Sequence, residues 1–173
     1  AVRFNFGGSS ELLAMMEVGP GGDLYICHDP YADRVSEKGL LERFETVAWL
    51  TPIIVVQPGN PKGIRSLEDL ARPGFRVGLP DARFATAGKL VRAALAERGL
   101  EKAVEANLQL ETRGHSELGL AVSEGHLDAA VVWNFVGHYY AGRLEPIPTG
   151  VTFPEIRVTV CLLKTARDVE AAR

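Results

Sequence analysis

The feature that most constrains the fold is a regular alternation of apolar runs and helical stretches in the middle of the chain. Each apolar run is short and is followed by residues with the spacing of an amphipathic helix. Such strand–helix–strand repetition predicts a parallel sheet with helices on both faces. The strand-like runs are 75–79, 108–111 and 129–133, and the helical stretches are 66–72, 86–99 and 116–124.

A cluster of proline and glycine at residues 58–63 interrupts this pattern and marks the clearest boundary. Further strand-like runs lie on either side of the alternating region, at 23–27, 46–50, 53–57 and 156–163. We therefore predict two lobes, one formed by residues 1–59 together with 151–173 and the other by 60–150. A chain that leaves one lobe and later returns to it creates a cleft, where strand ends face helix starts. The pattern at 165–173 predicts a last helix.

The first loop-to-helix corner has the sequence Phe6-Gly7-Gly8-Ser9-Ser10-Glu11. Glycines allow a tight turn, and Ser9 or Ser10 can cap a helix that continues through Leu12 to Met16. A helix start carries about half a positive charge, so this corner can hold an anion without a cationic side chain. An ordinary capped helix after a loop explains the same residues.

Composition excludes several classes of protein. The chain has 173 residues, enough for one domain or two small lobes, and a net charge of −3 with acids and bases intermixed. The absence of a basic stripe argues against nucleic acid as a partner. No apolar run approaches the roughly 20 residues needed to cross a bilayer, so we expect no direct membrane insertion.

The two cysteines, Cys27 and Cys161, lie far apart in strand-like runs. They pair in an oxidising compartment or remain buried free thiols, and we favour free thiols. Catalysis by Cys27 with His28 is disfavoured, because neighbouring residues on a strand point to opposite faces. The four histidines show no metal-ligand spacing.

Taken in order, four stretches of the chain resemble the periplasmic molybdate-binding proteins, which are the solute receptors of ABC importers. The likeness extends over nearly the whole sequence. It implies an α/β, two-lobed type II periplasmic-binding-protein fold, with mixed, mostly parallel sheets flanked by helices and a ligand cleft between the lobes. The four stretches are Phe6-Gly7-Gly8-Ser9-Ser10-Glu11-Leu12, Gly22-Asp23-Leu24-Tyr25-Ile26, Val77-Gly78-Leu79-Pro80 with Thr86-Ala87-Gly88, and Leu120-Ala121-Val122 with residues 124–133.

The resemblance also implies a set of ligand-binding positions. In the family, hydroxyl and main-chain donors at helix starts surround a tetrahedral oxyanion, which only accepts hydrogen bonds. The corresponding positions are Ser9 with its neighbour Ser10, Ala87 with Thr86 beside it, a main-chain donor near His115, and Trp133 at the place of a family tyrosine.

The sequence departs from the family in two respects. The family's first strand and helix and its C-terminal segment have no counterpart in these residues, which implies a fragment or a lobe completed in another way. Trp133 replaces a hydroxyl donor by an indole, which donates one N–H and cannot accept.

By this resemblance the chain is a non-enzymatic binding protein for molybdate or tungstate, with no cofactor. Its partners would be the small oxyanion and a membrane permease, and the chain would be a monomer. Its location would be periplasmic or extracellular, either free or held by a lipid anchor.

Other interpretations use the same residues. The fold serves as an effector-sensing domain in transcriptional regulators, which would require a DNA-binding helix-turn-helix that these residues lack. A different small anion or an organic ligand that stacks on Trp133 is the alternative within the binding class. An enzyme using Asp29, Asp81 or His115 ranks last, since no paired carboxylates or triad spacing supports it.

Overall fold

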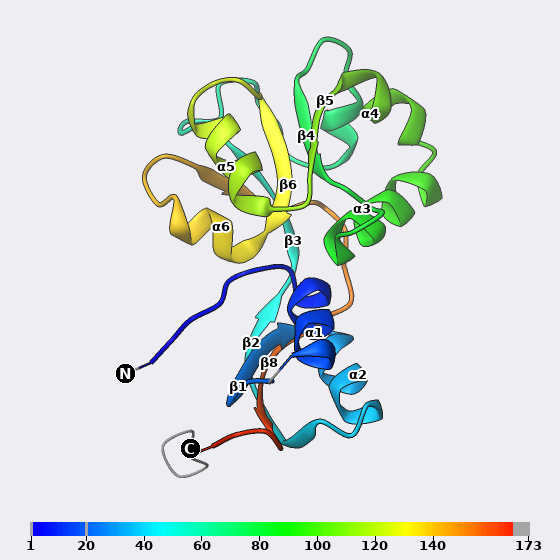
Figure 1. Ribbon diagram of the computed structural model, residues 1–173. Coiled ribbons are helices and arrows are strands. Elements are labelled where there is room, and N and C mark those ends of the chain that lie inside the picture. The colour runs from blue at the N-terminus through cyan, green and yellow to red at the C-terminus, as the bar shows by residue number, and fades with distance from the viewer. Residues whose placement is uncertain (1, 20, 168–173) are drawn as a thin grey trace. The chain divides into compact units, whose positions relative to one another are not determined.

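A computed structural model describes residues 2–19 and 21–167 of the chain (Figure 1). The chain forms two compact units. One consists of Ala1–Leu50 with Glu155–Arg173, and the other consists of Thr51–Pro154. From the sequence, the first boundary between the two lobes was predicted after residue 59. The structure places it after Leu50, because the next strand, β3 (Pro52–Val56), hydrogen-bonds only to strands of the second unit among the described residues.

The first unit contains a three-stranded antiparallel sheet. Its central strand β8 (Ile156–Leu163) lies between β1 (Leu24–His28) and β2 (Leu41–Leu50). Helices α1 (Ser9–Val18) and α2 (Tyr31–Glu37) contact these strands. The strand predicted at 156–163 is confirmed as β8.

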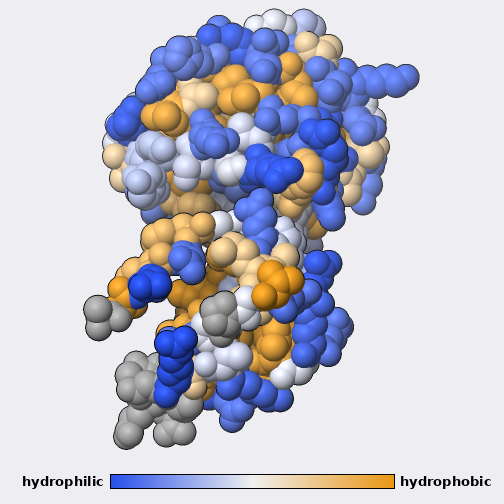
Figure 2. All heavy atoms as spheres, in the orientation of Figure 1, coloured by the Kyte–Doolittle hydropathy of each residue, from blue (hydrophilic) through white to orange (hydrophobic). Residues whose placement is uncertain are grey.

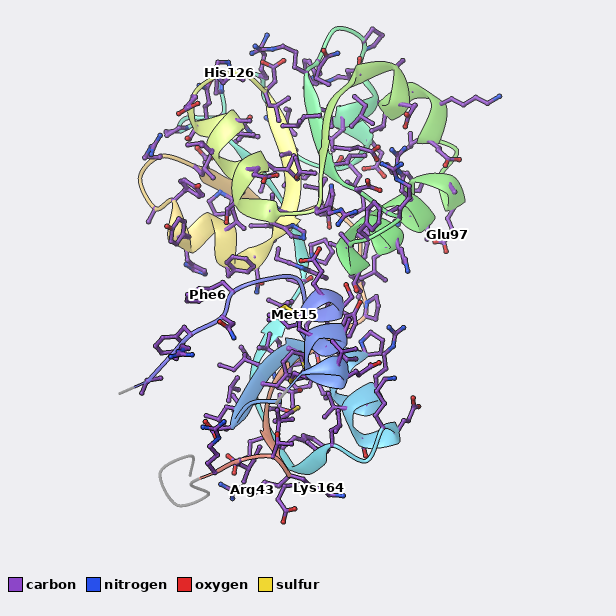
Figure 3. All side chains as sticks on the ribbon, in the orientation of Figure 1. Phe6, Met15, Arg43, Glu97, His126 and Lys164 are labelled. Atoms are coloured by element: carbon purple, nitrogen blue, oxygen red, sulfur yellow. The ribbon has the colours of Figure 1, made fainter. Side chains whose placement is uncertain are left out.

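Side chains on β1 alternate between the two faces of this sheet, as the period of a strand requires. Tyr25 and Cys27 are buried in a core cluster with Leu13 of α1, whereas Leu24 and Ile26 are 46% and 60% exposed. Apolar side chains therefore remain on the surface of this unit, where Figure 2 shows hydrophobic atoms. Exposed Phe6 lies on the segment before α1, and exposed Met15 lies on α1 itself (Figure 3).

The second unit contains a five-stranded sheet in the order β5-β4-β6-β3-β7. Strand β4 pairs in parallel with β5 and β6, and β3 pairs antiparallel with β6 and β7. The mixed sheet is confirmed, but parallel pairing is confined to the β5-β4-β6 part. The chain enters the unit through β3 and leaves it after β7, so these strands stand outside the strand–helix–strand repeats that favour parallel neighbours. The bounds are β4 (Val77–Pro80), β5 (Leu108–Thr112), β6 (Ala129–Trp133) and β7 (Glu145–Ile147).

Helices cover both faces of this sheet (Figure 1). On one face, α3 (Thr86–Glu97) and α4 (Glu101–Asn107) pack with the short 3-10 helix η1 (Glu68–Ala71). On the other face, α5 (His115–Ser123) and α6 (Asn134–Tyr139) bury Leu118, Val122 and Val136. The predicted arrangement of helices on two faces is confirmed.

Several predicted elements differ in detail. The helix predicted at 66–72 is only the single turn of η1, with Leu67 rather than Ser66 at its N-cap position. Helices α4 and α6 were not predicted, because seven and six residues are too few to show a clear helical period. The helix predicted at 165–173 falls largely on residues 168–173, outside the described part of the chain. Within the described ranges, no helix has the length and apolar character to span a membrane.

Candidate ligand-binding site

The candidate site of the second unit lies where its parallel strands end. Because β5, β4 and β6 run in the same direction, their carboxyl ends share one edge of the sheet. Each strand leads into a helix at this edge: β4 into α3, β5 into α5 and β6 directly into α6 (Figure 1). Helix starts that converge on one edge present main-chain N–H groups and the positive ends of their dipoles.

Hydrogen bonds fix the strand ends relative to one another. The Asp81 N–H donates to the Thr112 carbonyl over 2.8 Å, which joins the loop after β4 to the end of β5. The Trp133 N–H donates to Nδ1 of His115 over 3.2 Å, which joins the end of β6 to the start of α5. The two rings also stack, with centroids 5.6 Å apart. The structure thus brings together His115 and Trp133, which the sequence named separately.

The start of α3 carries two more of the predicted residues. Its N-cap residue is Ala85, which has no side-chain acceptor, so no side chain at this position binds the N–H groups of the first turn. Thr86 is half-buried and Ala87 is fully buried. Gly88 lies against the strand end, since a Cβ built on it would be 2.4 Å from the Pro80 carbonyl oxygen. The first turn of α3 is therefore held directly against the end of β4.

Two arginines and a phenylalanine lie on the loops that follow β4 and β5. The Asp81 carboxylate is buried and accepts hydrogen bonds from Arg83, the shortest being 2.6 Å. These bonds lower the pKa of Asp81 below its ordinary value. The guanidinium carbons of Arg83 and Arg113 lie 5.4 Å and 3.7 Å from the ring centroid of Phe84. Sequence reasoning missed this cluster, although both arginines follow predicted strands within a few residues.

The corner predicted in the first unit has a different cap from the one expected. Gly8 has the extended backbone of an N-cap residue, and Ser9 and Ser10 are the first two residues of α1. The prediction that a serine caps this helix is wrong, because Ser9 already has helical backbone geometry. The Gly8 N–H is instead bound by the carboxylate of Glu11, at 3.3 Å. The Tyr25 hydroxyl donates to the Ser9 carbonyl over 2.6 Å and fastens α1 to the sheet.

The six predicted ligand-binding residues are divided between the units. Ser9 and Ser10 belong to the first unit, whereas Thr86, Ala87, His115 and Trp133 share one sheet edge of the second. The carboxylates considered for catalysis are engaged in ion pairs, Asp81 with Arg83 and Asp29 with Arg157. Burial raises the pKa of Asp29, but hydrogen bonds from Arg157 outweigh it and the pKa is lowered.

Comparison with known proteins identifies the family. A sequence profile of the bacterial extracellular solute-binding proteins matches residues 1–173. The chain belongs to this family. The resemblance noted in the sequence is thereby confirmed, and the family's description is that of a binding protein rather than an enzyme.

Individual relatives match to different extents. A Haemophilus influenzae protein described as a binding protein is 24% identical over 173 residues, which is 99% of this chain and 71% of the relative. The molybdate-binding protein ModA of Mycobacterium tuberculosis is 44% identical over 78 residues, 44% of this chain and 30% of ModA. The chain thus matches less than a third of that relative's length.

Solved structures confirm the fold. The sulfate-binding protein SubI of Mycobacterium tuberculosis aligns with a TM-score of 0.73 and 19% identity, over 97% of this chain and 67% of SubI. A substrate-binding domain from Clostridium difficile, named for a molybdenum ABC transporter, aligns with a TM-score of 0.72 and 18% identity, over 99% of this chain and 76% of that domain. At such identities the likeness establishes the α/β type II periplasmic-binding-protein fold.

Proposed function

We propose that this protein is the substrate-binding component of an ABC importer for a tetrahedral oxyanion, molybdate or tungstate. The observation that carries the proposal is the sheet edge of the second unit, where α3 and α5 begin. Their N-cap residues, Ala85 and Gly114, have no side-chain acceptor to bind the first-turn N–H groups. An edge of this kind favours a small ligand that is rich in acceptors.

The chemistry of such an anion suits this edge. Molybdate and tungstate present only acceptor oxygens, and each hydrogen bond to a charged group contributes about 1.5–3 kcal/mol. Thr86 offers a hydroxyl and an N–H, Ala87 offers an N–H, and α5 adds main-chain donors at His115. About five to seven such bonds, less the costs of association, correspond to micromolar to nanomolar affinity.

The charges around the edge favour an anion. Arg83 is paired with Asp81, so this carboxylate does not face a bound oxyanion with its charge uncompensated. Arg113, on the neighbouring loop, adds positive potential and is held against Phe84. In this proposal Trp133, which is 4% exposed, shapes the site through its stacked ring rather than replacing the family's hydroxyl donor.

The serines of the first unit, Ser9 and Ser10, stay a prediction as ligand donors. The 44% identity to ModA over 78 residues supports molybdate as the first anion to test. Family membership supports a location outside the cytoplasm and a membrane permease as the partner.

Isothermal titration calorimetry of the purified chain against molybdate, tungstate, sulfate and phosphate tests the proposal. We expect saturable binding of molybdate and tungstate, and weaker binding of sulfate and phosphate. Thr86→Val keeps the shape of the side chain but removes its hydroxyl, and should weaken molybdate binding about tenfold. Lys89→Ala is the matched control, since Lys89 is exposed on the same helix.

Two results would overturn the proposal. Flat titrations with all four anions would exclude oxyanion binding by this chain. Tighter binding of sulfate than of molybdate would assign the site to a different anion. Ser9→Ala and Ser10→Ala, titrated in the same way, test whether the first unit supplies donors.

A further inference from the structure

The first unit buries two thiols next to each other in its sheet. In the antiparallel pairing of β1 with β8, Cys27 lies opposite Thr159 and Cys161 lies opposite Tyr25. The cysteines are therefore diagonal neighbours, and both side chains belong to the core cluster that includes residues of α1 and α2. Cys27 is 3% exposed and Cys161 is 0% exposed, and both are free thiols in this structure.

We propose that Cys27 and Cys161 are a disulfide-forming pair, which closes during oxidative folding and fastens β1 to β8 beneath α1. The inference rests on the location outside the cytoplasm given under the proposed function, since disulfides persist in oxidising compartments. It does not depend on which ligand the protein binds.

The coupling of the two thiols agrees with their diagonal positions in the sheet. A hydrogen bond with Cys161, together with burial, raises the pKa of the Cys27 thiol. The same hydrogen bond lowers the pKa of the Cys161 thiol.

A residue with a hydroxyl group lies opposite each cysteine in the sheet register. The Thr159 hydroxyl, opposite Cys27, is fully buried and has no hydrogen-bond partner among the described residues. The Tyr25 hydroxyl, opposite Cys161 in register, holds the first turn of α1 through the Ser9 carbonyl. A bond between the two sulfurs would therefore fix the strand from which α1 is positioned.

The oxidant is a disulfide, either a small molecule such as oxidised glutathione or that of a thiol–disulfide oxidoreductase. The thiolate of one cysteine attacks the oxidant, whose S–S bond breaks and releases one thiol. The thiolate of the other cysteine attacks the mixed disulfide and releases the second thiol, leaving the Cys27–Cys161 bond. Both cysteines lose their protons and are oxidised, and the oxidant is reduced to two thiols. Burial in the native state requires that this exchange occur before folding is complete.

Refolding in the presence of a disulfide oxidant tests the proposal. The reduced chain is unfolded in urea, refolded with oxidised and reduced glutathione, unfolded again without reductant and treated with iodoacetamide. We expect no alkylation, an intact mass lower by two hydrogen atoms, and a peptide containing Cys27 linked to one containing Cys161. Dithiothreitol should restore both alkylation sites. The urea midpoint of the oxidised chain should exceed that of the reduced chain.

The Cys27→Ser/Cys161→Ser double variant is the control and should have the same urea midpoint in both buffers. Alkylation of both cysteines after oxidative refolding would overturn the proposal. Two separate glutathione adducts, or a bridge between two copies of the chain, would overturn it equally. Because the wild-type chain gives the deciding masses, a variant that fails to fold leaves the test intact. Titration of the reduced chain with molybdate examines the proposed function separately.

Discussion

The main-chain N–H of Trp133 donates a hydrogen bond to Nδ1 of His115 over 3.2 Å. Since Nδ1 is the acceptor, the ring proton of the neutral imidazole lies on Nε2. The bond ties the last residue of β6 to the first residue of α5, and ring stacking reinforces the link. The His115 side chain therefore positions the start of a helix whose main chain is proposed to bind the ligand.

Replacing His115 with alanine should leave the Trp133 N–H without this acceptor. We expect the free energy of unfolding to fall by about 1–3 kcal/mol, because the hydrogen bond and the stacked ring are both lost. Molybdate affinity should fall about tenfold as the start of α5 loosens. Urea unfolding followed by tryptophan fluorescence and calorimetric titration measure the two effects. His115→Asn keeps an acceptor oxygen near the same place and should lose less of both. Equal behaviour of the two variants would show that the hydrogen bond does not matter.

The hydroxyl of Tyr25 makes a comparable link in the first unit. Tyr25 is 3% exposed, and its hydroxyl donates to the Ser9 carbonyl over 2.6 Å. Tyr25→Phe keeps the ring and removes the hydroxyl that makes this bond, so we expect a loss of about 0.5–1.5 kcal/mol in the free energy of unfolding. Faster amide hydrogen exchange in α1 should accompany it. Tyr139→Phe is the control, because Tyr139 is 74% exposed. If both variants unfold at the same urea concentration, Tyr25 does not fasten α1.

The elements predicted best are those whose buried residues form a simple apolar pattern in the sequence. All five residues of β6 are buried, so their apolar run is unmistakable, and α3 shows a clear apolar face. Strand β2 begins at Leu41, five residues before its predicted start at Thr46. These first residues were not predicted as a strand, because most side chains of β2 are exposed and many are charged. Its pairing with β8 determines it, and local sequence carries no sign of that partner.

Residues of the candidate site could be predicted only where one short strand-to-helix segment of the sequence contains them. Thr86 and Ala87 follow a strand and open a strong helix, which the sequence shows directly. The link from Trp133 to His115 joins residues 18 positions apart. The contact of Arg113 with Phe84 joins two different loops. Such pairs depend on which strands become neighbours, and the sequence alone left that order open.

Acid should destabilise the second unit partly through Asp128. This carboxylate accepts hydrogen bonds from the Arg76 main chain at 2.9 Å and from its guanidinium at 2.7 Å. Burial raises the pKa of Asp128, but the Arg76 hydrogen bonds outweigh it and the pKa is lowered. A lowered folded-state pKa stabilises the protein above the unfolded value of about 3.9, and this stability is lost as pH falls toward the folded value.

Asp128→Asn should therefore reduce stability near neutral pH by about 1–3 kcal/mol and have a smaller effect below about pH 3. Urea midpoints measured from about pH 2 to pH 7 should show the two proteins converging in acid. Glu97→Gln is the control, since Glu97 is exposed near the end of α3 (Figure 3). A constant difference between wild type and Asp128→Asn at every pH would contradict the assigned role.

The close approach of α3 to the end of β4 makes Gly88 the most sensitive position of the proposed oxyanion site. A Cβ at Gly88 would be 2.4 Å from the Pro80 carbonyl oxygen and 2.7 Å from the Ala82 nitrogen. Both are main-chain atoms, so an added methyl group can be accommodated only if the first turn of α3 moves away from the strand.

Gly88→Ala should therefore lower the free energy of unfolding by about 1–3 kcal/mol, as overpacking of a close contact does. It should also weaken molybdate binding by at least about tenfold, because Thr86 and Ala87 move with the helix. Lys89→Ala, one residue further along, changes an exposed side chain and should alter neither quantity. Calorimetry and urea unfolding measure both in parallel. A Gly88→Ala protein that is destabilised but binds molybdate normally would separate the start of α3 from the ligand.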